Sequence, residues 1–384
     1  MYALPYILLV AIIGIAAVYT QIRQDDEATQ RHIWIACIGL LLFFFGCRGF
    51  ICDDWLSYYP AFELCSSDKL HLNIFQQADN WNYEPGFTLW MLACKTLVNN
   101  YFFFQFCCTA LNLTLLLLFL RRRVDNIPFA LVLFICFGGY GMMTNLMRNS
   151  IAILIFANAL TYLERRQPLP YFGLCLLALS FHTSALLFFP LYFFLHRKCN
   201  RWVYLGIFIA GNAFFLGHVK VFLPLMSLIL GDGDGRLQLM VENYTSGELD
   251  GATGISIGYL ERLLTGVLFF CYYNKLCSIR PNNHIFMNLF IAYFCLFFFL
   301  SEFRIVSERL SMLFMMSYWI LWADLTHIFH YPNNRKLFIG FMTVYCTLKL
   351  IGMTNLVTSA YDNVLFGAKS YQERLYIHNR APKN

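Results

Sequence analysis

Two ionisable residues lie beside long apolar runs, where such side chains are costly. Arg148 occurs in the segment MMTNLMRNSIAILIF, and His182 occurs in LALSFHTSALLFF. A charged group at membrane depth costs about 2.5–3.5 kcal/mol on insertion scales, so it usually faces a polar cavity and has a function. Arg148 is suited to binding an anion, although it could also snorkel to the interface. His182 is suited to proton transfer, although it could also be a hydrogen-bonded core histidine.

Acidic residues form a second candidate group. Asp53 and Asp54 occur in CDDWLSYY, where acidic and aromatic residues are interspersed, and Glu84 occurs in NYEPGF. Carboxylates supply general bases, and aromatic rings supply flat apolar faces on which sugar rings stack. The alternatives are a solvated loop start for Asp53 and Asp54, and a favourable helix-dipole contact for Glu84 ahead of Pro85.

Further arginines extend the candidate site. Arg304 and Arg309 occur in SEFRIVSERLSM, where two glutamates also offer local ion pairs. Guanidinium groups form bidentate bonds to phosphate oxygens, so Arg148, Arg304 and Arg309 together indicate a bound phosphate or pyrophosphate. Arg48 could support the acidic residues of the segment that follows it without touching the substrate, or it could be an interfacial anchor.

The composition indicates which elements must hold these residues. Of 384 residues, 59% are hydrophobic and only 13% are charged, against about 25% charged in a typical soluble domain. Apolar runs near helix length recur along the chain, which indicates an all-α polytopic membrane protein. We predict about twelve spans, near residues 3–20, 33–50, 101–120, 127–142, 149–163, 170–181, 183–195, 202–217, 257–274, 284–300, 310–327 and 336–352.

Basic clusters set the predicted orientation. They fall between apolar runs, for example at Arg121–Arg123, Arg165–Arg166 and Arg335–Lys336, as the positive-inside rule leads us to expect of cytosolic loops. The net charge of +6 is therefore no sign of nucleic-acid binding. The N-terminus is then outside the cytosol. The residues predicted to converge on the outer face are Asp53, Asp54, Glu84, Arg148, His182, Arg304 and Arg309.

This orientation defines several outer elements. Residues 86–98 are too short for a full span, so we predict an interfacial or re-entrant helix there. A tight hairpin places His182 at its outer turn, and residues 218–256 form a larger outer loop. We predict a single transmembrane domain over residues 1–352, followed by a C-terminal tail over residues 353–384.

Neither a metal nor an organic cofactor is predicted. No Cys/His or acidic cluster in the sequence has convincing metal-ligand spacing, and no Walker loop or dinucleotide fingerprint occurs. Most of the 14 cysteines lie inside apolar runs and are expected to pack as small apolar residues. Cys52 and Cys65 lie in one predicted outer loop and could form a disulfide.

Five motifs follow one another in a fixed order relative to the hydrophobic segments: CDDWLSYY, NYEPGFTLWML, LMRNSIAILIF, LSFHTSALLFF and RIVSERLSMLF. In this ordered set, over residues 30–352, the sequence resembles the EpsG/Wzy-type family of polysaccharide repeat-unit polymerases. The resemblance implies a multi-pass protein of the bacterial inner (cytoplasmic) membrane that acts at its outer face. The resemblance implies functional roles for Asp53 or Asp54, Glu84, Arg148, His182 and Arg309. Arg304 is added on spacing alone.

The implied reaction transfers a growing glycan from undecaprenyl pyrophosphate onto the next lipid-linked repeat unit. Undecaprenyl-pyrophosphate-linked oligosaccharides are then both donor and acceptor, and a chain-length regulator and a flippase are candidate partners in the same membrane. We expect an inverting, metal-independent displacement in which the arginines stabilise the leaving pyrophosphate. His182 is the first choice for the base, with Asp53, Asp54 and Glu84 as alternatives.

Two other functions remain open from the sequence. Another polyprenyl-linked glycosyltransferase or an O-antigen ligase would differ in its acceptor, which the sequence does not identify. A transporter or flippase for lipid-linked oligosaccharides would have polar residues at both membrane faces and broken midplane helices in paired halves. The predicted clustering of the polar residues on one face favours the polymerase.

Overall fold

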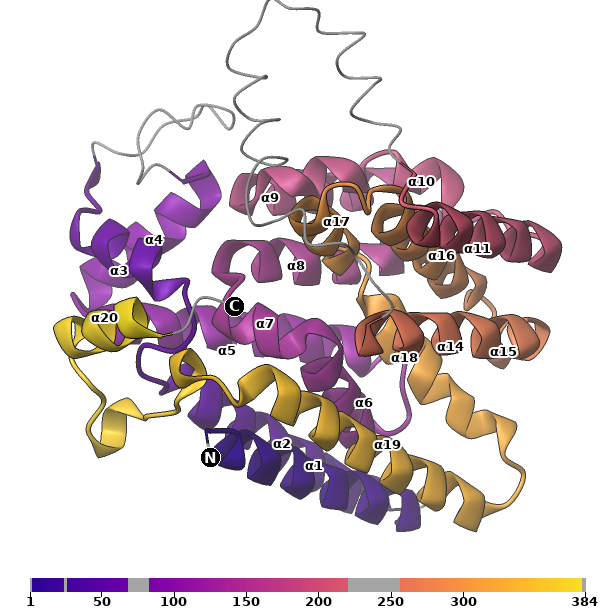
Figure 1. Ribbon diagram of the computed structural model, residues 1–384, viewed down its shortest axis with the longest axis horizontal. Helices are drawn as coiled ribbons and strands as arrows, with labels where there is room; N and C mark the ends of the chain where they lie inside the picture. The colour runs from indigo at the N-terminus through magenta and orange to yellow at the C-terminus, as the bar shows by residue number, and fades with distance from the viewer. Residues whose placement is uncertain (1, 24–25, 68–82, 220–255, 382–384) are drawn as a thin grey trace, which may run out of the picture. The chain divides into compact units, whose positions relative to one another are not determined.

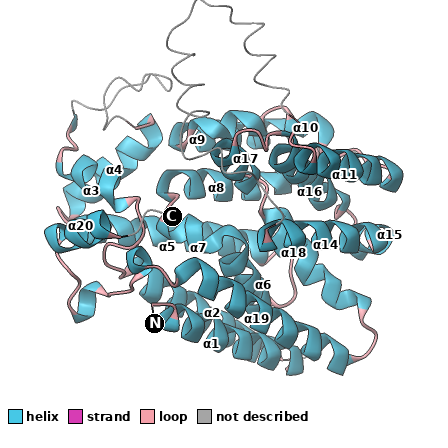
Figure 2. Cartoon of the chain, viewed as in Figure 1, coloured by secondary structure: helices cyan, strands magenta, loops and turns pink. Residues whose placement is uncertain are grey.

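The computed structural model describes residues 2–23, 26–67, 83–219 and 256–381. Within these ranges every regular element is a helix and no strand forms (Figure 2). The all-α fold predicted from the sequence is therefore confirmed. Almost all of the predicted outer loop at residues 218–256 lies outside the described residues.

The helices pack into two compact units. The first comprises residues 1–192 and 322–384, and the second comprises residues 193–321. This division is one of packing, and the single transmembrane domain predicted over residues 1–352 stays a prediction. The predicted C-terminal tail packs with the first unit as far as it is described.

The first unit contains both ends of the chain and the helices labelled α1 to α9, α19 and α20 in Figure 1. Its helices lying wholly in this unit are α1 (Leu4–Ile22), α2 (Glu27–Leu41), η1 (Leu42–Gly46), α3 (Trp55–Glu63), α4 (Pro85–Leu97), α5 (Tyr101–Leu120), α6 (Ile127–Phe134), η3 (Ile135–Gly139), α7 (Tyr140–Thr144), α8 (Met147–Glu164), α9 (Pro168–Phe181), η4 (Thr183–Phe188), η6 (Leu325–Ile328), α19 (Pro332–Thr354), η7 (Val357–Ser359), η8 (Val364–Phe366) and α20 (Tyr371–Arg380).

Five helical stretches of the described chain are long and apolar enough to cross a membrane, and all belong to the first unit. At 1.5 Å per residue they are about 27–35 Å long, which fits a hydrocarbon core about 30 Å thick. This supports the prediction of a multi-pass membrane protein. The five stretches are Leu4–Ile22, Glu27–Gly46, Tyr101–Leu120, Ile127–Thr144 and Pro332–Thr354.

Helix α8 is a buried element of the first unit. It packs against both α5 and α9, and every residue from Asn149 to Ala157 is buried. A helix that is buried on all sides offers a more precise support for functional groups than a loop does. Arg148 lies in the first turn of α8, so this candidate residue stands at the end of a rigid element.

Asparagine residues begin helices α5 and α6. Asn100 accepts a hydrogen bond from the amide of Phe102 at 2.8 Å, and Asn126 accepts one from the amide of Phe129 at 3.0 Å. N-cap asparagines satisfy amide groups that have no partner within the helix. These caps set where α5 and α6 begin, and the predicted span at 101–120 coincides with α5.

The second unit has an aromatic core. Tyr204 donates a hydrogen bond to the carbonyl of Gly266 at 2.9 Å. A Cβ atom at Gly266 would lie 2.2 Å from the Phe208 ring, so the close approach of α14 to α11 there requires glycine. The helices wholly within this unit are α11 (Arg201–Leu216), α14 (Ile257–Cys271), α15 (Tyr273–Ile279), α16 (His284–Phe299) and α17 (Arg304–Met312).

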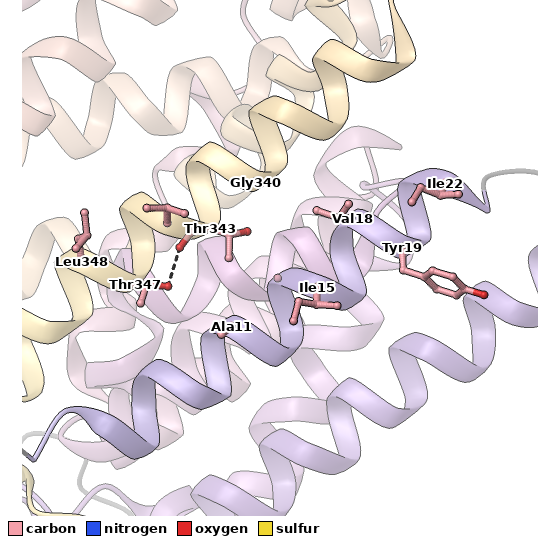
Figure 3. A pocket seen from close by; sticks show the side chains of 11 residues that line it. Ala11, Ile15, Val18, Tyr19, Ile22, Gly340, Thr343, Thr347 and Leu348 are labelled. Carbon is pink, nitrogen blue, oxygen red and sulfur yellow. Dashed lines mark hydrogen bonds between the residues drawn. The ribbon is translucent and has the colours of Figure 1, made fainter.

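Helices α1 and α19 form an apolar groove of about 590 Å³ (Figure 3). The two helices approach closely at Gly14, where a Cβ atom would lie 2.1 Å from Thr343 Cγ2. The hydroxyl groups of Thr343 and Thr347 donate to carbonyls of their own helix, each at 2.8 Å, so the groove presents little unsatisfied polarity. Small residues that let two helices pack closely are common between membrane helices.

Two of the predicted spans are interrupted. The apolar run predicted to span residues 183–195 forms η4 and the short helix α10 (Leu191–Phe194), with Pro190 between them. Proline has no backbone N–H and does not extend a preceding helix. The run predicted at residues 310–327 is divided between the end of α17, α18 (Met316–Asp324) and η6.

Candidate functional site

A left-handed residue turns the chain after η1 toward α8. Cys52 has a φ of 63°, which is uncommon for a residue with a side chain. Its carbonyl accepts a hydrogen bond from Trp55 Nε1 at 2.8 Å. The amides of Asp53 and Asp54 then donate to the Oδ1 atom of Asn145, at 2.9 and 3.3 Å. Asn145 thereby fixes the acidic pair beside the start of α8.

Asp54 binds the N-terminus of α8. Its Oδ2 atom accepts a hydrogen bond from the amide of Met147 at 3.1 Å. Amides in the first turn have no partner within the helix, and the N-terminus carries a partial positive charge that a carboxylate stabilises. Asp54 therefore has a structural task in addition to any chemical one.

The guanidinium of Arg148 is held on several sides. Its Nε atom donates to the Tyr58 hydroxyl at 3.0 Å, its Nη1 atom donates to Glu84 Oε2, and its Cζ atom lies 4.5 Å from the centre of the Tyr83 ring. The Arg148 side chain is 18% exposed and that of Glu84 is 3% exposed. These contacts fix the guanidinium in one orientation, unlike an anchor that extends freely to the membrane surface.

The two tyrosines at Arg148 are neutral near neutral pH. Burial raises the pKa of the Tyr58 phenol. Burial also raises the pKa of Tyr83 to about 12. The Tyr58 hydroxyl therefore accepts the hydrogen bond from Arg148 without itself carrying a charge, and Glu84 is the group that balances the guanidinium.

Glu84 connects α4, α8 and η4. Its Oε2 atom binds Arg148, and its Oε1 atom accepts a hydrogen bond from the amide of Thr183 at 3.1 Å. The start of α4 also meets the end of α9, since a Cβ atom at Gly86 would lie 2.3 Å from Ser180 Oγ. Glu84 makes no side-chain bond that caps its own helix. Glu84 therefore binds groups on α8 and η4, which the alternative role of only stabilising the dipole of its own helix does not explain.

His182 lies at the break between α9 and η4, where a turn was predicted. Its Nδ1 atom accepts a hydrogen bond from the amide of Ser184 at 3.1 Å, and Ser184 Oγ donates to Asn149 Oδ1 at 3.1 Å. Because Nδ1 accepts from an amide, the neutral ring carries its proton on Nε2. In that tautomer Nε2 donates a hydrogen bond and does not accept a proton. The geometry therefore argues against His182 as the base and favours it as a donor.

Arg48 is a buried support of the loop that carries Asp53. Its side chain donates to the Phe45 carbonyl at 2.6 Å, and its own carbonyl accepts a hydrogen bond from Gln105 at 2.6 Å. Only 4% of Arg48 is exposed, so it is not an exposed interfacial anchor. In the same loop, Cys52 and Cys65 are not joined by a disulfide in this structure.

The remaining predicted arginines belong to the second unit. Arg304 and Arg309 both lie on α17, and Arg309 is exposed. Their predicted role in pyrophosphate binding stays a prediction. The residues that the structure brings together around the start of α8 are therefore Asp53, Asp54, Glu84, Arg148 and His182.

The opposite end of α8 carries a basic cluster. Arg123 binds Glu164 and the hydroxyl of Thr161, each at 3.0 Å. Glu164 lies about 24 Å along α8 from Arg148 at 1.5 Å per residue. The candidate residues thus lie around the start of α8, whereas Arg123 contacts its end.

A sequence model of the EpsG family matches residues 31–371, which include every candidate residue described above. The chain belongs to the EpsG family. No curated protein and no solved structure matches it. Membership of the EpsG family indicates a membrane protein with a role like that of a polysaccharide polymerase, as the motifs led us to expect.

Some residues that build this EpsG-family site carry little signal in the sequence. Asn145 positions the acidic pair, and its only sequence signal is a polar residue just before α8. Tyr58 was seen only as one aromatic residue of an acidic loop, yet it binds Arg148. Separately from this site, within the second unit, Arg262 donates to the Tyr293 hydroxyl at 2.7 Å, and its Cζ atom lies 3.9 Å from the centre of the Phe297 ring.

The described part of the chain contains no group of three or more His, Cys, Asp or Glu residues that could hold a metal ion. The side chains at the described site are a fixed guanidinium, carboxylates, an imidazole and tyrosine hydroxyls.

Proposed function

We propose that this EpsG-family protein joins undecaprenyl-pyrophosphate-linked oligosaccharide repeat units at the outer face of the bacterial inner membrane. The donor is the growing glycan on its carrier, and the acceptor is the next lipid-linked repeat unit. The product is an O-antigen, a capsular polysaccharide or an exopolysaccharide. A flippase supplies the repeat units, and a chain-length regulator acts in the same membrane.

The observation that carries this proposal is the fixed guanidinium of Arg148 at the N-terminus of α8. A helix N-terminus favours anions, and arginine adds a planar set of donors that matches phosphate oxygens. Tyr58, Tyr83 and Glu84 hold the side chain in place before any ligand binds. A preorganised cation of this kind stabilises a pyrophosphate whose negative charge grows as it leaves.

Asp53 is the general base in this proposal. Its side chain is 62% exposed, whereas Asp54 binds the amide of Met147 and both oxygens of Glu84 are engaged. A base must reach the proton of an incoming sugar hydroxyl, and an accessible carboxylate can do so. His182 acts instead as a hydrogen-bond donor, for the reason given by its contact with Ser184.

The proposed step is a single displacement. The acceptor hydroxyl oxygen attacks the anomeric carbon of the sugar that is attached to the donor pyrophosphate. The new C–O bond forms as the bond from that carbon to the pyrophosphate oxygen breaks. The electron pair leaves with undecaprenyl pyrophosphate, which Arg148 stabilises, and the hydroxyl proton moves to the Asp53 carboxylate. A single displacement inverts the anomeric centre and needs no metal ion.

Carboxylates outnumber arginines in the described cluster, where Asp53, Asp54 and Glu84 accompany Arg148. A pyrophosphate carries more than one negative charge, so further cations must contribute to its binding. In this proposal Arg304 and Arg309 keep their predicted role as phosphate ligands.

The proposed topology has about twelve spans, with the N-terminus and the candidate residues on the outer side. Helix α4, which covers residues 86–97 of the segment predicted at 86–98, lies at the membrane interface or re-enters the membrane. The basic cluster at the far end of α8 supports this orientation, because short basic loops are retained in the cytosol.

Cells that lack the protein distinguish polymerisation from transport of the same lipid. We expect single lipid-linked repeat units to accumulate on the outer side of the inner membrane, where a membrane-impermeant glycosidase reaches them in spheroplasts. Expression of the wild-type chain should restore long glycans. Accumulation of single units on the cytosolic side, protected from the enzyme, would contradict the proposal and support a flippase.

The orientation can be measured with an introduced cysteine. Ser67 is exposed at the end of the described segment that follows α3. We expect Ser67→Cys to react with a membrane-impermeant maleimide in intact spheroplasts, in a background without Cys52 and Cys65. The same background without the new cysteine gives the signal from the other thiols. Labelling that appears only after permeabilisation would place the site on the cytosolic face and refute the topology.

A chelator tests the metal-free reaction. We expect polymerisation to continue at its usual rate in EDTA, because Asp53 and Asp54 act here as a base and a helix ligand. Activity that disappears in EDTA and returns with Mg²⁺ or Mn²⁺ would show that these carboxylates bind a metal ion.

A further inference from the structure

The C-terminal segment is joined to the loop that carries Asp53. The amide of Cys52 donates to the Thr358 carbonyl at 3.0 Å, the amide of Gly49 donates to the Asp362 carbonyl at 3.0 Å, and the amide of Val364 donates to the Cys47 carbonyl at 2.9 Å. These backbone bonds run along residues 47–52, immediately before the acidic pair. The segment after α19 is therefore built into the candidate site.

Side chains secure the same connection. The guanidinium of Arg374 binds Asp362 at 2.9 Å, and only 3% of the Arg374 side chain is exposed. The Tyr140 hydroxyl, which lies 3.2 Å from the Cys52 thiol, donates to Ser359 Oγ at 3.0 Å. A buried arginine paired with a carboxylate is costly to separate, so the tail has a defined position on the first unit.

Helix α20 lies against α3. Figure 1 shows α20 beside α3 at one end of the first unit. The Tyr371 ring stacks on the Tyr59 ring with centres 4.7 Å apart, and its centre lies 5.4 Å from that of Trp55. A capping box between Ser370 and Glu373 begins the helix. This packing brings the last turns of α20 to the start of α3, where Asp53 lies.

His378 on α20 reaches the proposed base. Its Nε2 atom lies 2.9 Å from Asp53 Oδ1, and its ring centre lies 6.1 Å from that of Trp55. The Asp53 side chain is 62% exposed, so this pair adds little to stability. An exposed carboxylate without such a contact rotates freely, whereas a base works best when it is held in one orientation.

We propose that His378 is a positioning residue that donates a hydrogen bond to Asp53 Oδ1 and directs Oδ2 toward the acceptor hydroxyl. This inference rests on the proposed function. His378 lies beyond the family match, which ends at residue 371. Asp53 lies inside the matched region, so only the His378 partner comes from outside the region by which the chain is recognised as an EpsG-family protein.

The test measures chain extension by purified full-length variants on lipid-linked repeat units, with kcat and KM determined separately. We expect His378→Ala to lower kcat about tenfold or more, since positioned proton transfer contributes about 10²–10⁴-fold in rate, with KM nearly unchanged. His378→Gln should recover most of the activity, because its side-chain amide also donates. Asn379→Ala, on the exposed side of the same helix, is the matched control and should behave as wild type.

A double-mutant cycle makes the result specific to the pair. Asp53→Asn should lower kcat strongly, and adding His378→Ala to it should cause no further loss, since the two residues act as one unit. Equal losses from His378→Ala in both backgrounds, wild-type activity of His378→Ala, or failure of His378→Gln to recover activity would each overturn the proposal. A wild-type protein that extends no glycan would instead contradict the proposed function itself.

Discussion

Arg148→Lys is expected to insert and fold but to lower the polymerisation rate about 10²–10³-fold, the usual effect of losing one positioned contact to a developing anion. Lysine keeps the positive charge but lacks the planar fork that Tyr58 and Glu84 hold in place. The shape of the cation, rather than its charge alone, therefore decides the rate. Gel analysis of glycan chain length in cells, with membrane abundance measured in parallel, gives the result.

The chain provides a matched control for this substitution at the other end of the same helix bundle. Arg123 is also a buried arginine that binds a glutamate and a hydroxyl. We expect Arg123→Lys to change abundance to a similar degree and to leave polymerisation per molecule intact. Wild-type chain lengths in cells carrying Arg148→Lys would show that Arg148 needs only its charge, as an interfacial anchor does.

Glu84→Gln is expected to destabilise the first unit by about 3 kcal/mol, near the lower end for breaking a buried ion pair, and to impair polymerisation. The lower end applies because the Arg148 side chain retains 18% exposure. Glutamine keeps the size of the side chain but leaves the guanidinium without its balancing charge. The change in unfolding free energy is measured by denaturant titration in detergent, alongside chain extension.

Glu164→Gln is the corresponding control, since Glu164 pairs with Arg123 away from the candidate site. We expect it to lose stability without losing polymerisation per folded molecule. If Glu84→Gln lowered the free energy of unfolding by less than about 1 kcal/mol, the Glu84–Arg148 ion pair would behave as a solvent-exposed pair, which would contradict its burial in the structure. Unimpaired chain extension by Glu84→Gln would mean that Arg148 does not need Glu84 for its position.

Two apolar runs with polar ends were predicted closely. The span predicted at 101–120 is α5, and the one predicted at 149–163 lies within α8. Asn100 marks the start of α5 because asparagine caps free amides. The run at 183–195 misled the prediction, because hydropathy is continuous across Pro190 although the helix is not.

The gathering of Asp53, Glu84, Arg148 and His182 was also predictable, because the topology predicted from the sequence places all four residues on one side of the membrane. The pairings were not. Glu84 and Arg148 are 64 residues apart, and Asp53 and His378 are 325 residues apart. Motif order places such residues at one end of the molecule, but the choice of partner depends on side-chain packing that no local pattern encodes.

The roles of individual residues depended most on atomic contacts. The preference for His182 as the base came from the ordinary pKa of imidazole, whereas the amide of Ser184 at Nδ1 favours a donor role for the ring. Arg48 could be an anchor or a partner of the acids from sequence alone, and its bonds to Phe45 and Gln105 make it a support of the loop. These distinctions concern single hydrogen bonds, which composition and spacing do not determine.

The central claim, that this chain alone polymerises lipid-linked repeat units, is tested most directly by reconstitution. Purified protein in liposomes is incubated with undecaprenyl-pyrophosphate-linked repeat units, and the products are separated by length. We predict a ladder of glycans that differ by one repeat unit, with release of undecaprenyl pyrophosphate in proportion to the bonds formed. With Arg148→Lys at equal protein, the ladder should form about 10²–10³-fold more slowly. Intact single units with wild-type protein, or movement of those units across the bilayer without elongation, would contradict the account.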